Sequence, residues 1–197
     1  QVNVSDSYPY VTVSYPIINA ALNIITQAAV VTTNNRTLIV KVAGTTTGSP
    51  TALSDPQKLA LQSYLEQIMP PGTQWTILSV LPDRVFIQAN VYYDASYSGV
   101  IQAAMDAAVT NFLSSIPFNG TFEVSQLLEA MMGVMGVSDV VLNNVQVRQS
   151  DQDFGTGINL VLSNQVINRN WATYAGYAAP ENTSGQTLDD QITYNPS

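Results

Sequence analysis

Residues 84–116 change their hydrophobic period once, and this change constrains the fold more than any other stretch. From Arg84 to Tyr93, one set of alternate residues is apolar and the other is mixed, which is typical of a strand with two different faces. From Ser98 to Ile116, apolar residues recur at i, i+3, i+4 and i+7, which is the spacing of a long amphipathic helix. A strand and a helix of this kind must bury their apolar faces against a shared core, which predicts an α+β domain.

The next stretch, from Pro117 to Val147, ends that helix and predicts a second one. A proline cannot continue a helix, and Asn119-Gly120 favours a tight turn. The spacing over 124–132 predicts a short helix that buries Val124, Leu127, Leu128 and Met131. Strands are then expected over 137–148, where Asn143-Asn144 interrupts an apolar run, and over 158–166.

The N-terminal half predicts further strands and two helices. Strands are expected at 11–13, at 30–33 and 37–43 around the turn residues Asn34-Asn35, and at 75–81 before a turn at Pro82-Asp83. A helix is expected over 17–29. Ser54 and Gln57 form a capping-box pattern, so another helix should run from there to Pro70, with an apolar stripe made of Leu61, Tyr64, Leu65 and Ile68.

These elements predict an α+β fold with mixed or antiparallel sheets and three to four helices, for which two small strand–helix subdomains are one arrangement. We divide the chain into an N-terminal extension with a helix and a strand, two α+β subdomains, and an aromatic, Asn-rich tail. The corresponding ranges are 1–36, 37–95, 96–166 and 167–197.

The low charge content limits the classes of partner. Charged residues make up 10% of the chain, its net charge is −8, and its six basic residues are scattered. Nucleic acids and anionic membrane surfaces both attract clusters of Lys and Arg, so we expect neither as a partner. Membrane insertion is not expected either, because no apolar run reaches the roughly 18 residues of a transmembrane helix. A neutral polar surface suits packing against other protein subunits, because less charge has to be desolvated.

The residue types also limit the chemistry. The chain has no Cys and no His, so disulfides, thiolates and the commonest general base are missing. A Ser–Lys pair would need Lys41 or Lys58, and neither lies near a serine framed by glycines. We therefore expect no catalytic residue, no cofactor and no small-molecule substrate. The chain begins at Gln1 rather than Met, which indicates a processed product or a piece of a longer protein.

Two glycine-containing stretches are candidates for ligand loops. The loop over 151–157 places Asp151 and Asp153 before two glycines, but it lacks the further oxygen ligands of a calcium loop, so we expect a solvated turn and no metal. The stretch 133–136 lacks the Lys of a phosphate loop and is expected to end a helix and form a tight turn. The three methionines beside it, Met131, Met132 and Met135, are expected to fill the core.

The aromatic tail is the main candidate for a contact surface. Trp171, Tyr174 and Tyr177 are large aromatic residues of the kind that is enriched in protein interfaces. The same three residues are equally compatible with covering the core of their own domain.

Three stretches in a fixed order resemble a known family. They are Thr37-Leu38-Ile39-Val40-Lys41-Val42-Ala43-Gly44, then Leu53-Ser54-Asp55 with a helix ending in Pro70-Pro71-Gly72-Thr73, and last Ile116-Pro117-Phe118-Asn119-Gly120 with Ser125, Leu127 and Gly136-Val137-Ser138-Asp139-Val140. Together they look like the C-terminal half of baseplate J-like proteins, the wedge components of contractile phage tails and related injection machines. The resemblance covers residues 37–147.

The resemblance implies a structural protein without enzyme activity, located in the baseplate of a virion tail that is assembled in the bacterial cytoplasm. Its partners would be other baseplate or tail proteins, or further copies of itself. An alternative is a secreted or cell-surface bacterial binding module for a glycan or a protein, based on the exposed-looking aromatic and Asn residues. A third hypothesis is an enzyme that uses a carboxylate pair, for which Glu123 with Glu129 and Asp94 with Asp106 are candidates.

Overall fold

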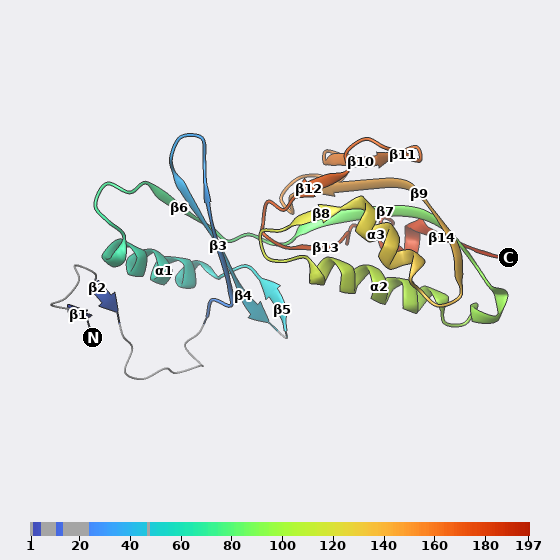
Figure 1. Cartoon of the computed structure of the whole chain (residues 1–197), viewed down its shortest axis with the longest axis horizontal. Helices are drawn as coiled ribbons and strands as arrows, with labels where there is room; N and C mark the ends of the chain where they lie inside the picture. The colour runs from blue at the N-terminus through green and yellow to red at the C-terminus, as the bar shows by residue number, and fades with distance from the viewer. Residues whose placement is uncertain (1, 5–10, 14–23, 47) are drawn as a thin grey trace.

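The computed structural model describes residues 2–4, 11–13, 24–46 and 48–197. Apart from a short hairpin of β1 (Val2–Val4) and β2 (Val11–Val13), the described residues form two lobes placed end to end along an elongated molecule (Figure 1). We call residues 24–81 the N-terminal lobe and residues 82–197 the C-terminal lobe. The predicted α+β class is confirmed. No helix among the described residues is long and apolar enough to cross a membrane.

The N-terminal lobe is a sheet with one helix on it. β4 (Leu38–Thr46) lies at its centre, antiparallel to β3 (Gln27–Thr32) and parallel to β6 (Trp75–Leu78), and β5 (Ser49–Thr51) pairs with its end. The helix α1 (Asp55–Ile68) begins after Ser54, whose N–H donates to Oε1 of Gln57 over 2.9 Å as the capping-box pattern predicts. The small core between helix and sheet consists of Val40, Val42, Leu53, Leu61 and Leu65.

The C-terminal lobe is built around β7 (Asp83–Tyr93). β9 (Val137–Arg148) pairs antiparallel with one edge of β7, followed by β10 (Ile158–Leu162) and β11 (Gln165–Val166). The other edge of β7 pairs in parallel with β13 (Ala178–Pro180) and β14 (Ile192–Pro196). The helices are α2 (Ile101–Ser115), α3 (Val124–Met132) and α4 (Leu188–Gln191), with a short 3-10 turn, η2 (Ala95–Tyr97), before α2. β8 (Thr121–Glu123) pairs separately with β12 (Asn170–Ala172).

The period-two and helical patterns of the sequence meet in this lobe, as predicted. The alternate residues Val85, Ile87, Ala89 and Val91 of β7 are buried in one core with the apolar stripe of α2 (Ile101, Met105, Val109, Phe112 and Leu113). The predicted helix over 124–132 is confirmed, although Leu128 is only half-buried. The Asn pair that interrupts β9 forms a bulge, because Gln88 pairs with Asn144 and Ala89 with Leu142, which leaves Asn143 as the extra residue.

Several predictions about the N-terminal lobe are corrected. Most of the helix expected over 17–29 lies outside the described residues, but Gln27 to Ala29 belong to β3, where pairing with β4 satisfies the backbone. In the hairpin turn, Arg36 rather than the Asn pair has a positive φ, of 61°. Tyr64 and Ile68 are 41% and 46% exposed, so the buried stripe of α1 is narrower than predicted.

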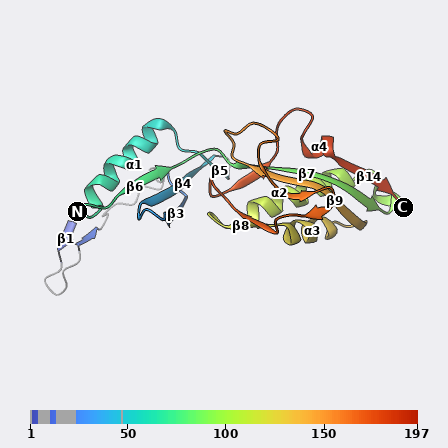
Figure 2. The same ribbon diagram turned by 90° about the horizontal axis from the view of Figure 1, so that it is seen from above.

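The strands around Pro82-Asp83 belong to different sheets. β6 pairs with β4, whereas β7 pairs with β9, so the change from one sheet to the next lies between residues 78 and 83. It does not coincide with the boundary expected at residues 95–96. The tail over 167–197, which has little periodicity, contributes β12, β13, α4 and β14 to the C-terminal lobe. Figure 2 shows β14 lying along β7.

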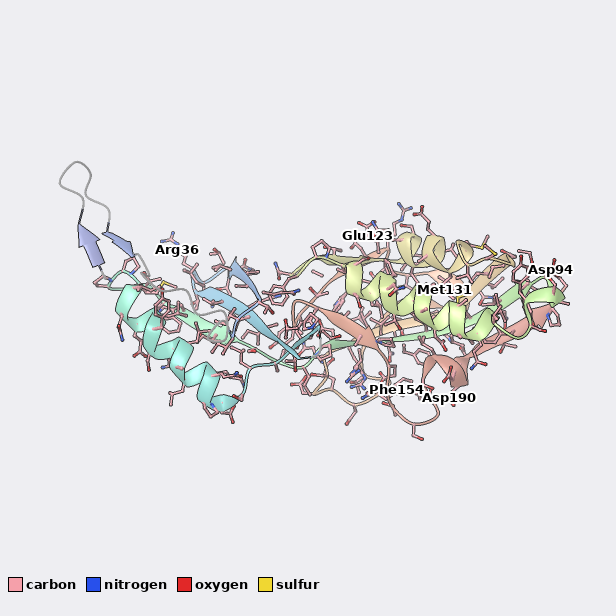
Figure 3. The ribbon with its side chains drawn as sticks, turned by 90° about the horizontal axis from the view of Figure 1, so that it is seen from below. Arg36, Asp94, Glu123, Met131, Phe154 and Asp190 are labelled. Carbon is pink, nitrogen blue, oxygen red and sulfur yellow. The ribbon has the colours of Figure 1, made fainter. Side chains whose placement is uncertain are left out.

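The three methionines near the end of α3 have different environments. Met131, labelled in Figure 3, is completely buried in the main core, whereas Met132 and Met135 are 40% and 75% exposed. The prediction of core filling is therefore correct for Met131 and wrong for the other two: Met132, the last residue of α3, and Met135, in the following turn, both lie on the surface.

The two extreme methionines allow a matched test of the core. Met131→Ala should lower the free energy of unfolding by about 2–5 kcal/mol, because it removes buried atoms and leaves a cavity. Met135→Ala should change it by less than about 0.5 kcal/mol, since the side chain lies on the surface. Urea unfolding of both variants measures the difference. Equal losses would show that Met131 does not occupy the main core.

Candidate functional site

Residues 173–177, which we call the joint segment, hold the two lobes together. The ammonium Nζ of Lys41, on β4, donates a hydrogen bond to the carbonyl oxygen of Thr173 over 2.8 Å. The carboxylate Oδ2 of Asp83, at the start of β7, accepts one from the N–H of Ala175 over 2.9 Å. One short stretch of backbone is thus bonded to a buried charged residue of each lobe.

Apolar contacts surround these polar bonds. Ala43 of the N-terminal lobe, Ala175 and Tyr177 form a buried cluster, against which Val80 and Phe118 pack. The Tyr177 hydroxyl donates to the carbonyl oxygen of Val80 over 2.8 Å, and its ring stacks on Phe118 with ring centroids 6.2 Å apart. The cluster removes the joint from water, which strengthens the hydrogen bonds inside it.

The turn over 117–120 lies directly against the joint segment. The N–H of Asn119 donates to the carbonyl oxygen of Gly176 over 2.7 Å, and the N–H of Thr173 donates to that of Gly120 over 3.2 Å. Gly176 has a φ of 98°, and a Cβ added there would lie 2.7 Å from the ring of Phe118. A glycine is therefore required at residue 176 by both backbone conformation and space.

Burial changes the electrostatics of the joint. Asp83 is fully buried, and this burial raises the pKa of its carboxyl to about 6, although the backbone N–H groups of Ala175 and Tyr174 and the charge of Lys41 oppose the rise. Burial likewise lowers the pKa of Lys41, and the nearby Asp83 opposes that change. Oδ1 of Asp83 has no hydrogen-bond partner among the described residues. The joint therefore contains a carboxyl group whose buried charge is incompletely compensated.

A buried ion pair fixes the part of the tail that follows the joint segment. Arg148, at the end of β9, binds Glu181 through two hydrogen bonds of 2.8 and 2.7 Å. Burial alone would raise the pKa of Glu181, but hydrogen bonds from Arg148, Thr183 and the N–H of Asn182 outweigh it and lower the pKa to about 2. The pair holds the residues after β13 against the end of β9.

A pair of acidic residues lies between α2 and α4. Burial raises the pKa of Asp106 to about 6, and a hydrogen bond with Asp189 adds to the rise. Gln102 also donates to Asp189, over 3.0 Å. The predicted partner of Asp106 was Asp94, but Asp94 lies before η2 and caps it by accepting from the N–H of Ser96. The observed acidic pair joins two helices of the same lobe, and neither of its residues lines the clefts beside the joint.

Two clefts flank the joint. One, of about 160 Å³, lies between Gln27, Ser49 and Pro50 of the N-terminal lobe and residues of α2 and β13. The other, of about 290 Å³, is lined by Ala52, Lys58, residues 79–81, residues 149–151 and Tyr174. Within the described ranges, no group of three or more acidic side chains is placed to hold a metal ion. The contacts at the joint fix the relative position of the two lobes. Its one amine, that of Lys41, is already bound to the carbonyl oxygen of Thr173.

The three aromatic residues predicted as an interface do not form one surface. Tyr177 is 7% exposed and belongs to the joint, Trp171 is half-buried against the main core, and Tyr174 is 41% exposed beside the larger cleft. The loop over 151–157 is mostly exposed, and Phe154 packs edge-on against Phe86 with ring centroids 5.2 Å apart. Glu123 precedes α3 and Glu129 lies within it, and neither residue lines the two clefts beside the joint.

Four charged residues of these buried contacts were missed from the sequence: Lys41, Asp83, Arg148 and Glu181. A signal was available for two of them. Lys41 lies in the apolar run 38–43, and Arg148 ends the apolar strand β9, and charges in such places need a buried partner. Their partners, Thr173 and Glu181, lie in the tail and carry no recognisable pattern.

No protein-family model matches this chain, and a search of curated proteins finds no relative.

We expect Asp83 to make the protein less stable as the pH rises from about 4 to above 6. Its folded pKa of about 6 exceeds the ordinary value of 3.8, so the folded chain holds a proton that the unfolded chain releases in this range. The neutral carboxyl group therefore contributes its full stabilisation below the unfolded pKa of 3.8 and loses it above the folded pKa of about 6. The free energy of unfolding should fall by about 3 kcal/mol between these two pH values. Asp106 adds to the same fall, since its pKa is also about 6.

Asp83→Asn should remove the contribution of Asp83, because the amide keeps the shape of the neutral carboxyl group. Urea unfolding at several pH values between about 4 and 7 measures the slope of stability against pH. Asp55→Asn is the control, since the side chain of Asp55 is 96% exposed. A wild-type slope in Asp83→Asn would show that this carboxyl group titrates normally.

The ion pair of Arg148 and Glu181 gives a separate expectation. Glu181→Gln should lower the free energy of unfolding at pH 7 by about 3–5 kcal/mol, because it leaves the buried guanidinium without a counter-charge. The double variant Arg148→Met with Glu181→Gln should recover most of this loss, since Gln can still accept from the N–H groups of Asn182 and Thr183. Urea unfolding measures both, and an additive double variant would contradict the pairing.

Proposed function

We propose that this chain is a non-enzymatic structural component of a phage or prophage-like tail baseplate, where it acts as a rigid two-lobed link between neighbouring subunits. Its partners are other baseplate or tail proteins, or further copies of the chain. The proposal combines the resemblance to baseplate J-like proteins with the construction of the joint. It assigns no catalytic residue, no cofactor and no small-molecule substrate.

The observation that carries the proposal is that two of the stretches resembling baseplate J-like proteins, the first and the last, both contact the joint segment. Lys41 and Ala43 come from the first stretch, and Phe118 to Gly120 come from the last, yet both contact residues 173–177. These residues make buried bonds and close packing, so their chemistry serves the relative position of the lobes. A subunit that sets the orientation of its neighbours needs such a fixed position.

The binding-module alternative receives less support from the geometry. It relied on exposed aromatic residues, but Tyr177 is buried and Trp171 is half-buried with its backbone paired to Phe122. Tyr174 is the most exposed of the three, at 41%. A carboxylate enzyme is supported still less, since Asp106 and Asp189 lie between α2 and α4 and do not line the clefts beside the joint.

The test is to locate the chain on particles. Antibody raised against it, with gold label, should mark the base of tail-like particles in electron micrographs of lysates from the induced source bacterium. Antibody absorbed with the purified chain is the control. Label on cell envelopes with unmarked tails would overturn the baseplate proposal in favour of a surface binding module.

A pair of glycine variants tests the role of the joint in that assembly. Gly176→Ala should exclude the chain from particles, because the new Cβ meets the Phe118 ring. Gly185→Ala is the matched control, since Gly185 also has a positive φ, of 75°, but has open space around it. The two variants are expressed in a strain that lacks the chain, and particle incorporation is compared by immunoblot. Equal incorporation would show that the joint is not needed.

A further inference from the structure

An open groove of about 490 Å³ lies between α1 and β6. Its walls are Lys58, Gln62 and Glu66 on the helix and Trp75, Thr76 and Ile77 on the strand. Figures 2 and 3 both show the helix beside this strand. The three helical residues are spaced by four, which places them on one face of α1. The groove therefore has one wall of polar side chains and one wall formed by a strand.

The strand wall is an open sheet edge. β6 pairs with β4 on one side only. The N–H of Leu38 donates to the carbonyl oxygen of Gln74 over 2.9 Å, and in a parallel pair alternate residues direct their backbone groups to the same neighbour. Thr76 therefore faces β4, whereas Trp75 and Ile77 direct N–H and C=O outward. In the described part of the chain, no hydrogen bond beyond the β4 pairing engages these groups.

Three devices that commonly prevent strand pairing are missing from this edge, which is four residues long. Natural edge strands are commonly protected by Lys, proline or a bulge. Residues 75–78 contain no charge and no proline, and their pairing with β4 has a regular register. An edge with free backbone groups beside a groove is the arrangement that accepts an added strand.

We propose that β6 binds an extended segment of a partner protein as an additional antiparallel strand, lying in the groove against α1. The added strand would pair with the outward N–H and C=O groups of Trp75 and Ile77. Antiparallel pairing is the slightly more stable arrangement per residue. The proposal rests on the groove and the edge alone, so it adds a partner site to the baseplate link without depending on that function.

Charges at the two ends of the groove indicate the sequence of the partner. Lys58 and Glu66 are eight residues apart, which corresponds to about 12 Å along the helix and about four residues of a strand. The chain reverses between α1 and β6, so Lys58 lies towards the end of β6 and Glu66 towards its start (Figure 1). An antiparallel partner strand should therefore carry an acidic residue first, neutral or apolar residues next, and a basic residue last.

Lys58 and Glu66 make only weak contacts within the chain, which a partner's side chains can replace. Lys58 lies 3.3 Å from Asp55, whose side chain is 96% exposed, and Gln62 donates to Glu66 over 3.0 Å. Exposed pairs of this kind contribute roughly 0–1 kcal/mol each. A partner that supplies opposite charges can replace them at little loss.

The probe is a capped peptide, Glu-Val-Thr-Val-Lys, added to the full chain, and its control is the reversed peptide Lys-Val-Thr-Val-Glu. Amide hydrogen exchange is followed by NMR. The amides of Trp75 and Ile77 should exchange about tenfold more slowly when nine-tenths of the chain is bound. The amide of Thr76, which already faces β4, and the amides of β3 at the other edge of the sheet should change little.

Swapping the two charges tests the assigned direction. The wild-type chain should bind the first peptide about three- to tenfold more tightly than the reversed one, and Lys58→Glu with Glu66→Lys should invert this preference. Both substitutions lie on exposed or half-exposed surface, and circular dichroism checks that the fold is kept.

Equal affinity for the two peptides, or uniform protection along β6, would overturn the proposal. Protection of Trp75 and Ile77 that depends on protein concentration without peptide would assign the edge to a second copy of the chain instead.

Discussion

The hydrogen bond from Lys41 to the carbonyl oxygen of Thr173 is the contact on which the two-lobed arrangement most depends. Lys41 is 8% exposed, so its ammonium group needs this acceptor and the nearby charge of Asp83. The acceptor is a backbone group, which means that the joint segment must run in one conformation past β4. Gly176 and the stacked rings of Phe118 and Tyr177 then fix that conformation.

The tail ties this joint to the rest of the C-terminal lobe. After the joint segment the chain forms β13 on the edge of β7, and Glu181 then binds Arg148 at the end of β9. The beginning of β7 is therefore held by backbone pairing on both sides and by Asp83 in the joint. Although the chain has few charged residues, four of them are buried, and each of the four binds and positions a backbone segment or another buried charge. These residues are Lys41, Asp83, Arg148 and Glu181.

Periodic patterns predicted the elements that form the main core. The alternation in β7 and the apolar stripe of α2 are visible in the sequence because each element buries one face in the same core, and a buried face repeats with the period of its element. The joint left no such pattern: Thr173 and Ala175 contribute backbone groups, which any residue supplies. β13 and β14 are short strands that pair in parallel with residues about 100 positions earlier, so local sequence does not reveal them. The aromatic residues of the tail, predicted to lie either at an interface or over the core, occupy both environments, since Tyr177 is buried and Tyr174 is exposed.

The pairing of β7 with β13 and β14 also has a consequence for synthesis of the protein. Asp83 pairs with Ala178 and Tyr93 with Pro196, so the central strand waits for residues made about 100 positions later. At roughly 5–20 residues per second, this edge stays unpaired for about 5–20 s on a translating ribosome. During this time neighbouring chains on one messenger RNA expose the same open strand close together, and an unpaired strand edge is a site for association between incomplete chains.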